Sequence, residues 1–159
     1  MIYRETGRES RQRDLEEVHS VDAKQQAAQH QGETDRALIR AADQARRFAY
    51  VPYSGFRVGA ALLDEKGCLF SGCNVENASY GATCCAERTA VFKAISEGAG
   101  KIRRMAVVCD QDKPCMPCGI CRQVLAEFAT EDFLLLAAAA DGSYRAYTIE
   151  GLLPDAFSL

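Results

Sequence analysis

The sequence predicts an α/β domain in which helices pack on one mixed sheet of five strands. Apolar residues recur at helical spacing in three segments, and five shorter apolar segments have the composition of strands. Their order along the chain is helix, two strands, helix, strand, helix, two strands. Interleaved elements of this kind form one sheet covered by helices. The 159 residues are enough for one domain with a proper core.

Residues 1–34 differ in composition from the rest of the chain, and we expect them to form a polar, flexible extension. Charged and amide side chains crowd this stretch, so it offers little apolar surface to bury. We assign it no function. The folded domain is expected over residues 35–159, with Thr34 as the N-cap of a helix that ends near Tyr50. The apolar face of this helix is expected to contain Leu38, Ala41, Ala42, Ala45, Phe48 and Ala49.

A β-hairpin is expected to follow the first helix. Residues 56–63 and 68–75 are apolar enough to form its strands, and residues 64–67 between them have the composition of a turn. Small and polar residues at positions 77–83 then predict a loop. Loops on a rigid scaffold commonly carry binding groups, so this loop is a candidate for substrate contacts.

The second half of the domain alternates between helices and strands. A helix is expected over residues 85–97, an apolar strand over residues 102–109, and another helix from Cys118. Strands over residues 133–140 and 144–149, with an Asp-Gly turn between them, complete the sheet.

A cluster of cysteines and one glutamate carries the chemistry. Cys85 stands two residues before Glu87, and Cys118 and Cys121 form a Pro-Cys-x-x-Cys motif. Both motifs lie at the start of an expected helix, where Cys118 and Cys121 share one face. Three thiolates can hold a zinc ion and leave its fourth position for water, as in catalytic rather than structural zinc sites. Glu87 is then the group that takes and returns the proton of that water.

Each motif also has a less specific interpretation. A Cys-x-x-Cys alone suits a dithiol redox site or half of a structural zinc site, and Glu87 alone could merely offset a helix dipole. Cys115 and Cys118 form a second Pro-Cys-x-x-Cys. We favour Cys118 and Cys121 because the helical pattern follows them, which leaves Cys115 in the preceding loop. Cys84 has no glutamate two residues later, so packing is its expected role.

The overall composition excludes several classes of protein. The net charge of −3 without a basic run argues against nucleic acid as a partner, so a small molecule is the better candidate. No apolar run is long enough to cross a membrane, and no signal peptide is visible. Eight cysteines without such a signal favour a reducing, cytoplasmic location. Three of them lie in strand patterns and are expected to be buried: Cys68, Cys73 and Cys109.

Five motifs together resemble the small, homotetrameric, zinc-dependent cytidine deaminases. The resemblance covers residues 35–159 and is carried by PYSGFRVGAAL from Pro52, GCNVENASY from Gly72, CAER from Cys85, PCGICRQ from Pro117 and LLPDAF from Leu152. It implies a three-layer α/β/α fold, with helices on both faces of the five-stranded sheet. It also implies one Zn²⁺ per chain, held by Cys85, Cys118 and Cys121, with Glu87 as the catalytic proton shuttle.

The same resemblance implies roles for the substrate-binding residues: Phe56, Asn74, Glu76, Tyr80, Ala86 and Phe157. Asn74 and Glu76 would bind the ribose hydroxyls, and Phe56 would pack against the pyrimidine. Phe157 would reach a substrate bound to a neighbouring subunit, and Tyr80 would help to complete that shared site. Arg88 and Arg122 would donate hydrogen bonds to the ligand sulfurs, which offsets the negative charge of three thiolates.

The reaction implied is hydrolytic deamination of cytidine or deoxycytidine to uridine or deoxyuridine, with release of ammonia, as used in pyrimidine salvage. A blasticidin-type nucleoside deaminase shares the Cys-Ala-Glu and Pro-Cys-x-x-Cys motifs and is the nearest alternative. Asn74, Glu76 and the Phe157 tail favour cytidine instead. A zinc or thiol redox protein without catalysis at Glu87 is a further alternative, and it leaves Asn74 and Glu76 unexplained.

Overall fold

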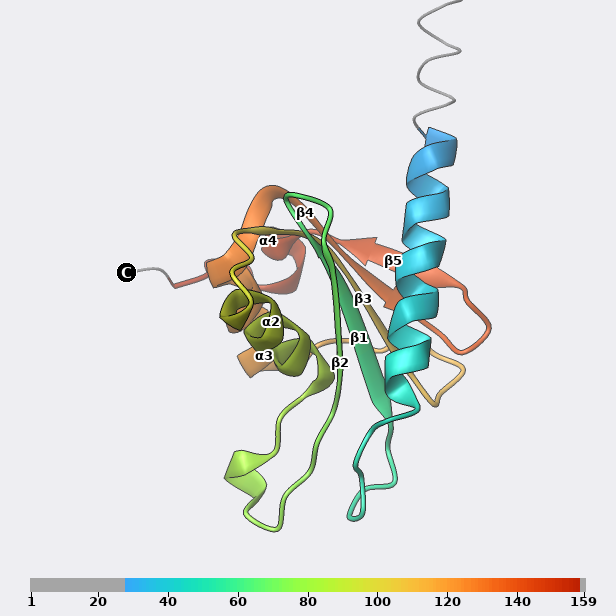
Figure 1. The fold of residues 1–159 in the computed structure, drawn as a ribbon, viewed down its shortest axis with the longest axis vertical. Helices are drawn as coiled ribbons and strands as arrows, with labels where there is room; N and C mark the ends of the chain where they lie inside the picture. Colours follow the sequence, from blue (N-terminus) through green and yellow to red (C-terminus); the bar gives the residue numbers. More distant parts are fainter. Residues whose placement is uncertain (1–27, 158–159) are drawn as a thin grey trace, which may run out of the picture. The chain divides into compact units, whose positions relative to one another are not determined.

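The computed structural model describes residues 28–157 (Figure 1). The first helix covers residues 28–46. The elements that follow it are β1 (Val58–Asp64), β2 (Leu69–Cys73), the 3₁₀ turn η1 (Tyr80–Ala82), α2 (Ala86–Ser96), β3 (Ile102–Cys109), α3 (Gly119–Phe128), β4 (Ala129–Ala138), β5 (Tyr144–Tyr147) and α4 (Ile149–Leu152).

The five strands form one mixed sheet in the order β2-β1-β3-β4-β5. Strands β3 and β4 run parallel, and the other neighbours are antiparallel. Helix α3 makes the crossover between the two parallel strands, as a parallel pair requires. The predicted five-stranded mixed sheet is confirmed.

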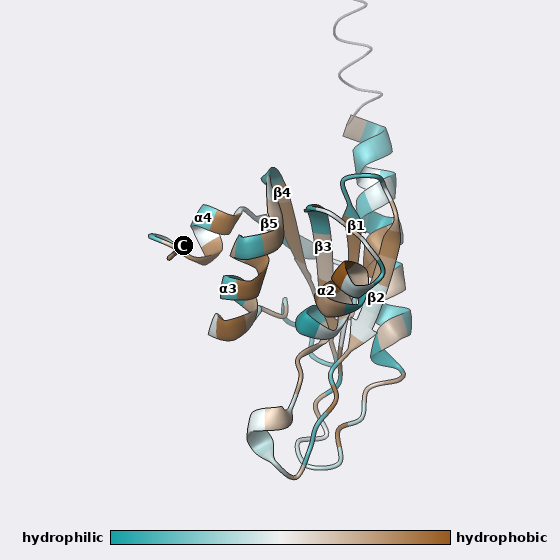
Figure 2. Ribbon diagram, turned by 60° about the vertical axis from the view of Figure 1, so that its left-hand side comes forward, coloured by the Kyte–Doolittle hydropathy of each residue, from teal (hydrophilic) through white to brown (hydrophobic). Residues whose placement is uncertain are grey.

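Alternate residues of the strands enter two separate cores, because side chains along a strand point to opposite faces. Ala60 and Leu62 of β1 pack in a cluster with residues of α2, α3 and α4. Ala61, between them, packs in a second cluster with Leu38 and Ala42 of the first helix. Figure 1 shows α2, α3 and α4 on one face of the sheet and residues 35–46 of the first helix on the other. Residues 35–157 therefore have the expected three layers, and hydrophobic colour runs along β1, β3 and β4 between the helices (Figure 2).

Two glycines let helices approach the sheet closely. A Cβ atom at Gly59 in β1 would overlap the carbonyl oxygen of Ala42 in the first helix. A Cβ atom at Gly72 in β2 would lie 2.6 Å from the backbone nitrogen of Ala90 in α2 and 2.9 Å from Cβ of Thr89. The distance between each helix and the sheet is thus set by the absence of a side chain.

The start of the first helix differs from the prediction. The chain is already helical at residue 28, and Thr34 lies inside the helix, where its hydroxyl donates to the carbonyl of His30 at 3.0 Å. Thr34 is therefore not an N-cap. The helix ends at residue 46, and Phe48 is 80% exposed in the turn that follows, so its predicted place on the apolar face is wrong. The proposed extension lies largely in residues 1–27, outside the described part of the chain.

Other boundaries shift by a few residues. Strand β1 begins at Val58 rather than at residue 56, and β4 begins at Ala129, where exposed acidic residues hid the strand pattern. Helix α4 was not predicted because its four residues are too few to show a period. Asp64 closes the hairpin turn, since its Oδ1 accepts hydrogen bonds from the backbone of Lys66 and Cys68. None of the helices in residues 28–157 is long and apolar enough to cross a membrane.

Candidate active site

Three cysteine sulfurs meet where α2 and α3 begin. Cys85 is the N-cap residue of α2, Cys118 is the N-cap residue of α3, and Cys121 is buried in the first turn of α3. The sulfurs of Cys85 and Cys118 lie 3.8 Å apart, and those of Cys118 and Cys121 lie 3.5 Å apart. The fold thus brings together the three cysteines expected from the motif spacing, with all three sulfurs within 4.8 Å of one another.

This cluster fits a zinc ion. Tetrahedral zinc–sulfur bonds of about 2.3 Å place neighbouring sulfurs about 3.8 Å apart, close to the two distances in this structure. Three thiolates this close would repel one another strongly without a cation between them. The adjoining helix N-termini also favour the thiolate form, because their backbone N–H groups carry partial positive charge.

Glu87 lies in the first turn of α2, two residues after Cys85, and is only 4% exposed. Burial raises the pKa of its carboxyl to about 7, and the negative charge of Cys85 adds to the effect. Its own backbone N–H acts in the opposite direction. A carboxyl in this environment can hold or release a proton near neutral pH, as a proton shuttle must.

Arg88 contacts the cluster through one end of its guanidinium. Its Nη2 donates to the Cys85 sulfur at 3.6 Å and to the Thr83 carbonyl at 3.0 Å, while its Nε is buried without a partner. The pKa of Cys85 is lowered to about 5, first by a hydrogen bond from Cys121 and then by Arg88. The expected contact of Arg88 with a sulfur is therefore present.

Arg122 is placed differently from the expectation. Its Nε donates to the Pro117 carbonyl and its Nη1 to the Leu152 carbonyl, both at 2.9 Å. Neither of these two hydrogen bonds of the guanidinium involves a sulfur. Arg122 thus connects the loop before Cys118 to the end of α4, a contact that no local sequence pattern indicates.

The other cysteines lie outside the cluster. Cys115 is half-buried, packs against the core beside α2 and α3, and does not belong to the three-sulfur group. Cys84 pairs through its backbone with Val75 and is half-buried. Cys109 is buried as expected and Cys73 is half-buried. Cys68 is exposed in the hairpin turn, so its predicted burial is wrong.

Phe56 lies just before the start of β1, and Asn74 and Glu76 lie just after the end of the neighbouring strand β2. The Asn74 amide donates to the Phe56 carbonyl at 2.9 Å and accepts from the Val58 backbone at 2.8 Å. The Glu76 carboxylate accepts from the backbone N–H of Tyr53 at 2.9 Å. Asn74 therefore holds the segment that carries Phe56.

Ser54 was missed by the sequence analysis. Its hydroxyl oxygen accepts from the Phe56 backbone at 3.0 Å, and a hydrogen bond between Ser54 and Glu76 lowers the pKa of that carboxyl. Ser54 thus connects two of the expected substrate-binding residues. Its place two residues before Phe56, in a turn sequence, was the available signal, because serine commonly caps the backbone two residues on.

The remaining candidate residues differ in exposure. Tyr80 is 77% exposed on η1, with its ring 6.0 Å from that of Tyr53 in an edge-to-face arrangement. Phe157 is 66% exposed, and its carbonyl accepts from Gln123 at 3.1 Å. The side chain of Ala86 is fully buried in the core, so this residue can reach a ligand through its backbone alone.

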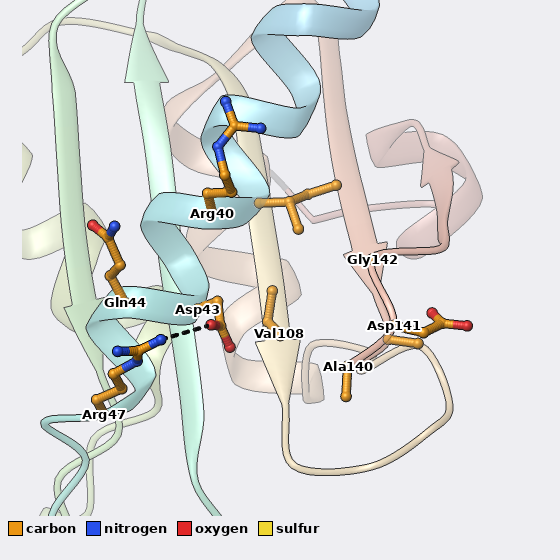
Figure 3. Close-up of a pocket in the computed structure, with 10 residues that line it drawn as sticks. Arg40, Asp43, Gln44, Arg47, Val108, Ala140, Asp141 and Gly142 are labelled. Carbon is orange, nitrogen blue, oxygen red and sulfur yellow. Dashed lines mark ion pairs between the residues drawn. The ribbon is translucent and has the colours of Figure 1, made fainter.

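A surface pocket between the first helix and the turn after β4 is separate from this site (Figure 3). Arg40, Asp43 and Arg47 line it, and Asp43 forms an ion pair with Arg47 at 3.8 Å. Its apolar lining residues Ile39 and Val108 belong to the core on the first helix's side of the sheet. None of the candidate site residues lines this pocket.

Comparison with known proteins agrees with this geometry. A family model described as the cytidine and deoxycytidylate deaminase zinc-binding region matches residues 32–137. A cytidine deaminase of Halalkalibacterium halodurans is 52% identical over 121 residues, which cover 76% of this chain and 92% of that protein. The cytidine deaminase of Mycobacterium tuberculosis strain H37Rv is 47% identical over 118 residues, 74% of this chain and 85% of that protein.

A solved structure shares the fold as well. The crystal structure of cytidine deaminase from Burkholderia pseudomallei superimposes with a TM-score of 0.73 at 48% identity, covering 76% of this chain and 97% of that chain. The family match includes both cysteine motifs and the glutamate between them. The chain therefore belongs to the zinc-binding cytidine and deoxycytidylate deaminase family.

Proposed function

We propose that this protein is a zinc-dependent cytidine deaminase that converts cytidine and deoxycytidine to uridine and deoxyuridine. The observation that carries the proposal is the buried Glu87 carboxyl beside a three-sulfur cluster. A structural zinc site has no need of such a carboxyl. Named relatives at 52% and 47% identity support the nucleoside as substrate.

Cys85, Cys118 and Cys121 would hold the zinc ion. When bound there, zinc supplies a Lewis acid that makes water acidic near neutral pH. Three thiolate ligands would make zinc a weaker Lewis acid because of their negative charge. Arg88 donates to the Cys85 sulfur and so withdraws part of that charge. Arg122 would act indirectly, by fixing the loop that carries Cys118 through its bond to the Pro117 carbonyl.

Glu87 would move the protons of the reaction. It takes a proton from the attacking water and gives it to N3 of the pyrimidine, which makes C4 a better electrophile as the hydroxyl oxygen adds. The proton of the new C4 hydroxyl would then pass through Glu87 to the amino group on C4, the C4–N bond would break as the C4 carbonyl forms, and ammonia would leave. One water is consumed for each ammonia released. The burial of Glu87 keeps this carboxyl away from competing bulk water.

Substrate binding would involve the segments around β1 and β2. Glu76 and Asn74 would bind the ribose hydroxyls, Phe56 would pack on the pyrimidine, and the Ala86 backbone would contribute at the start of α2. The Tyr53 and Ser54 N–H groups both donate to one oxygen of the Glu76 carboxylate and so fix its orientation.

We also propose a homotetramer with active sites shared between subunits. Tyr80 and Phe157 are large, exposed apolar side chains that a neighbouring subunit would cover.

The expected division into an extension over residues 1–34 and a catalytic domain over residues 35–159 is kept, because the family motifs all lie in the second part. A cytoplasmic location stays a prediction, and fractionation of expressing cells would test it.

The test is to incubate the zinc-loaded protein with cytidine and to measure uridine and ammonia together. Equal amounts of both products at an enzymatic rate support the proposal. Turnover of blasticidin S without turnover of cytidine would indicate the other nucleoside deaminase. Bound zinc with no turnover of either compound would contradict a deaminase function for the site.

A further inference from the structure

The backbone just before β1 is held by side chains on both sides of the strand. The antiparallel pairing of β1 with β3 ends at Val58 and Cys109, so Arg57 lies opposite Asp110 where the ladder stops. At that position the Arg57 N–H donates to the Asp110 carboxylate, Oδ2, at 3.3 Å. On the β2 side, the Asn74 amide binds the Val58 N–H and the Phe56 carbonyl.

Asp110 is itself held from the first helix. Its other carboxylate oxygen, Oδ1, forms an ion pair with Arg46. Arg46 is also fixed by Asp43, whose Oδ1 accepts from its Nη2 at 2.6 Å and from its Nε at 3.0 Å. The first helix, the end of β3 and the residue next to Phe56 are thus joined by one chain of charge-assisted hydrogen bonds.

We propose that Asp110 is a positioning residue that sets the Phe56 segment for binding the pyrimidine. The inference rests on the proposed function, since it takes Phe56 as the residue that packs on the base. In this role Asp110 acts through the Arg57 backbone rather than through a contact with the substrate. Asp110 accepts from the N–H of Arg57, the residue after Phe56, and so fixes the position of Phe56. A small displacement of a binding group lowers turnover steeply.

The alternative is that Arg46 and Asp110 form an ion pair with no effect beyond stability. Asp110 is 40% exposed, and exposed ion pairs contribute little to folding. The two interpretations differ in how Asp110 couples to Phe56. A residue that only stabilises the fold lowers activity equally whether or not Phe56 is present, whereas a positioning residue loses its effect once Phe56 is removed.

The experiment compares Asp110→Ala, Phe56→Ala and the double variant. We expect Asp110→Ala to lower kcat/KM for cytidine about tenfold, the effect of one lost hydrogen bond to a charged group, with zinc content unchanged. In the Phe56→Ala background the same substitution should change kcat/KM by less than about twofold. Asp110→Asn keeps an acceptor for the Arg57 N–H and should retain more activity than Asp110→Ala. Asp132→Ala, which removes the exposed ion pair with Arg103, is the matched control.

Hydrogen exchange of the Arg57 amide provides a second readout that needs no substrate. It should become about tenfold faster in Asp110→Ala, and faster than wild type by a smaller factor in Asp110→Asn, while the Met105 amide in β3 keeps its rate. An unchanged Arg57 rate, or an equal loss of activity in both Phe56 backgrounds, would overturn the proposal. If the wild-type protein does not deaminate cytidine, the proposed function fails, and the exchange rates alone decide whether Asp110 holds this segment.

Discussion

Replacement of Gly72 by alanine tests how packing on β2 sets the geometry of the cluster formed by Cys85, Cys118 and Cys121. The added Cβ would lie 2.6 Å from the Ala90 nitrogen and 2.9 Å from Cβ and Cγ2 of Thr89. Ordinary van der Waals contact begins at 3.4 Å, so the difference of 0.8 Å is the displacement that α2 or β2 must make. The obstructing Ala90 nitrogen is backbone and cannot rotate away.

The displacement acts on the site because α2 carries Cys85 and Glu87 at its start. Moving α2 relative to α3 changes the 3.8 Å separation of the Cys85 and Cys118 sulfurs. A misplacement near 1 Å can lower turnover about 100-fold, so we expect kcat/KM for cytidine to fall roughly 10- to 100-fold. Overpacking of this kind costs about 1–3 kcal/mol of folding free energy. For a chain of this size that lowers Tm by roughly 2–12 °C.

The assay is cytidine turnover of Gly72→Ala, with Tm and zinc content measured on the same preparation. Gly151→Ala is the matched control, because the nearest atom to its added Cβ would be the Thr148 Oγ1 at 3.6 Å. It should behave like the wild type. Wild-type turnover and Tm in Gly72→Ala would refute the argument that close contact with β2 sets the position of α2.

Two further predictions concern the metal. Cys121→Ser should lose zinc because it removes one of the three clustered sulfurs, whereas Cys115→Ser should keep it. Elemental analysis of the purified proteins measures the zinc content. Loss of zinc from Cys115→Ser but not from Cys121→Ser would mean that Cys115 is the ligand. When free zinc is about 1,000-fold above its Kd, binding to the native state alone stabilises the fold by about 4 kcal/mol. Removal of this zinc by a chelator should therefore lower Tm by about 10 °C. Scanning calorimetry measures this shift, and an equal shift in Cys121→Ser would show that it arises elsewhere.

Much of the fold follows from local patterns. A strand that is buried on both faces has a continuous apolar run in its sequence. This run predicted β1, in which Ala60 and Leu62 enter one core and Ala61 enters the other. Cys118 and Cys121 were placed together because residues three apart share a helix face. Their approach to Cys85 followed from the combination of motifs rather than from any one of them.

The features that were missed depend on contacts distant in sequence. Thr34 has the residue type of an N-cap, yet the helix extends through it, because a cap signal does not exclude an earlier start. Arg122 donates to a carbonyl 30 residues away instead of to a sulfur, and Asp110 accepts from the backbone just before β1, 53 residues away. Gly72 has no local signature at all, since the reason for glycine there is the approach of α2.

The central claim is that Glu87 beside the three sulfurs is the catalytic acid and base, and the rate of uridine formation by zinc-loaded Glu87→Gln tests it most directly. The amide fills the same buried space but cannot carry a proton between water and the pyrimidine. We predict that this variant binds as much zinc as the wild type and forms uridine at least 100-fold more slowly, in the range lost with a general acid–base group. Uridine formation at close to the wild-type rate, with equal zinc content, would contradict the account.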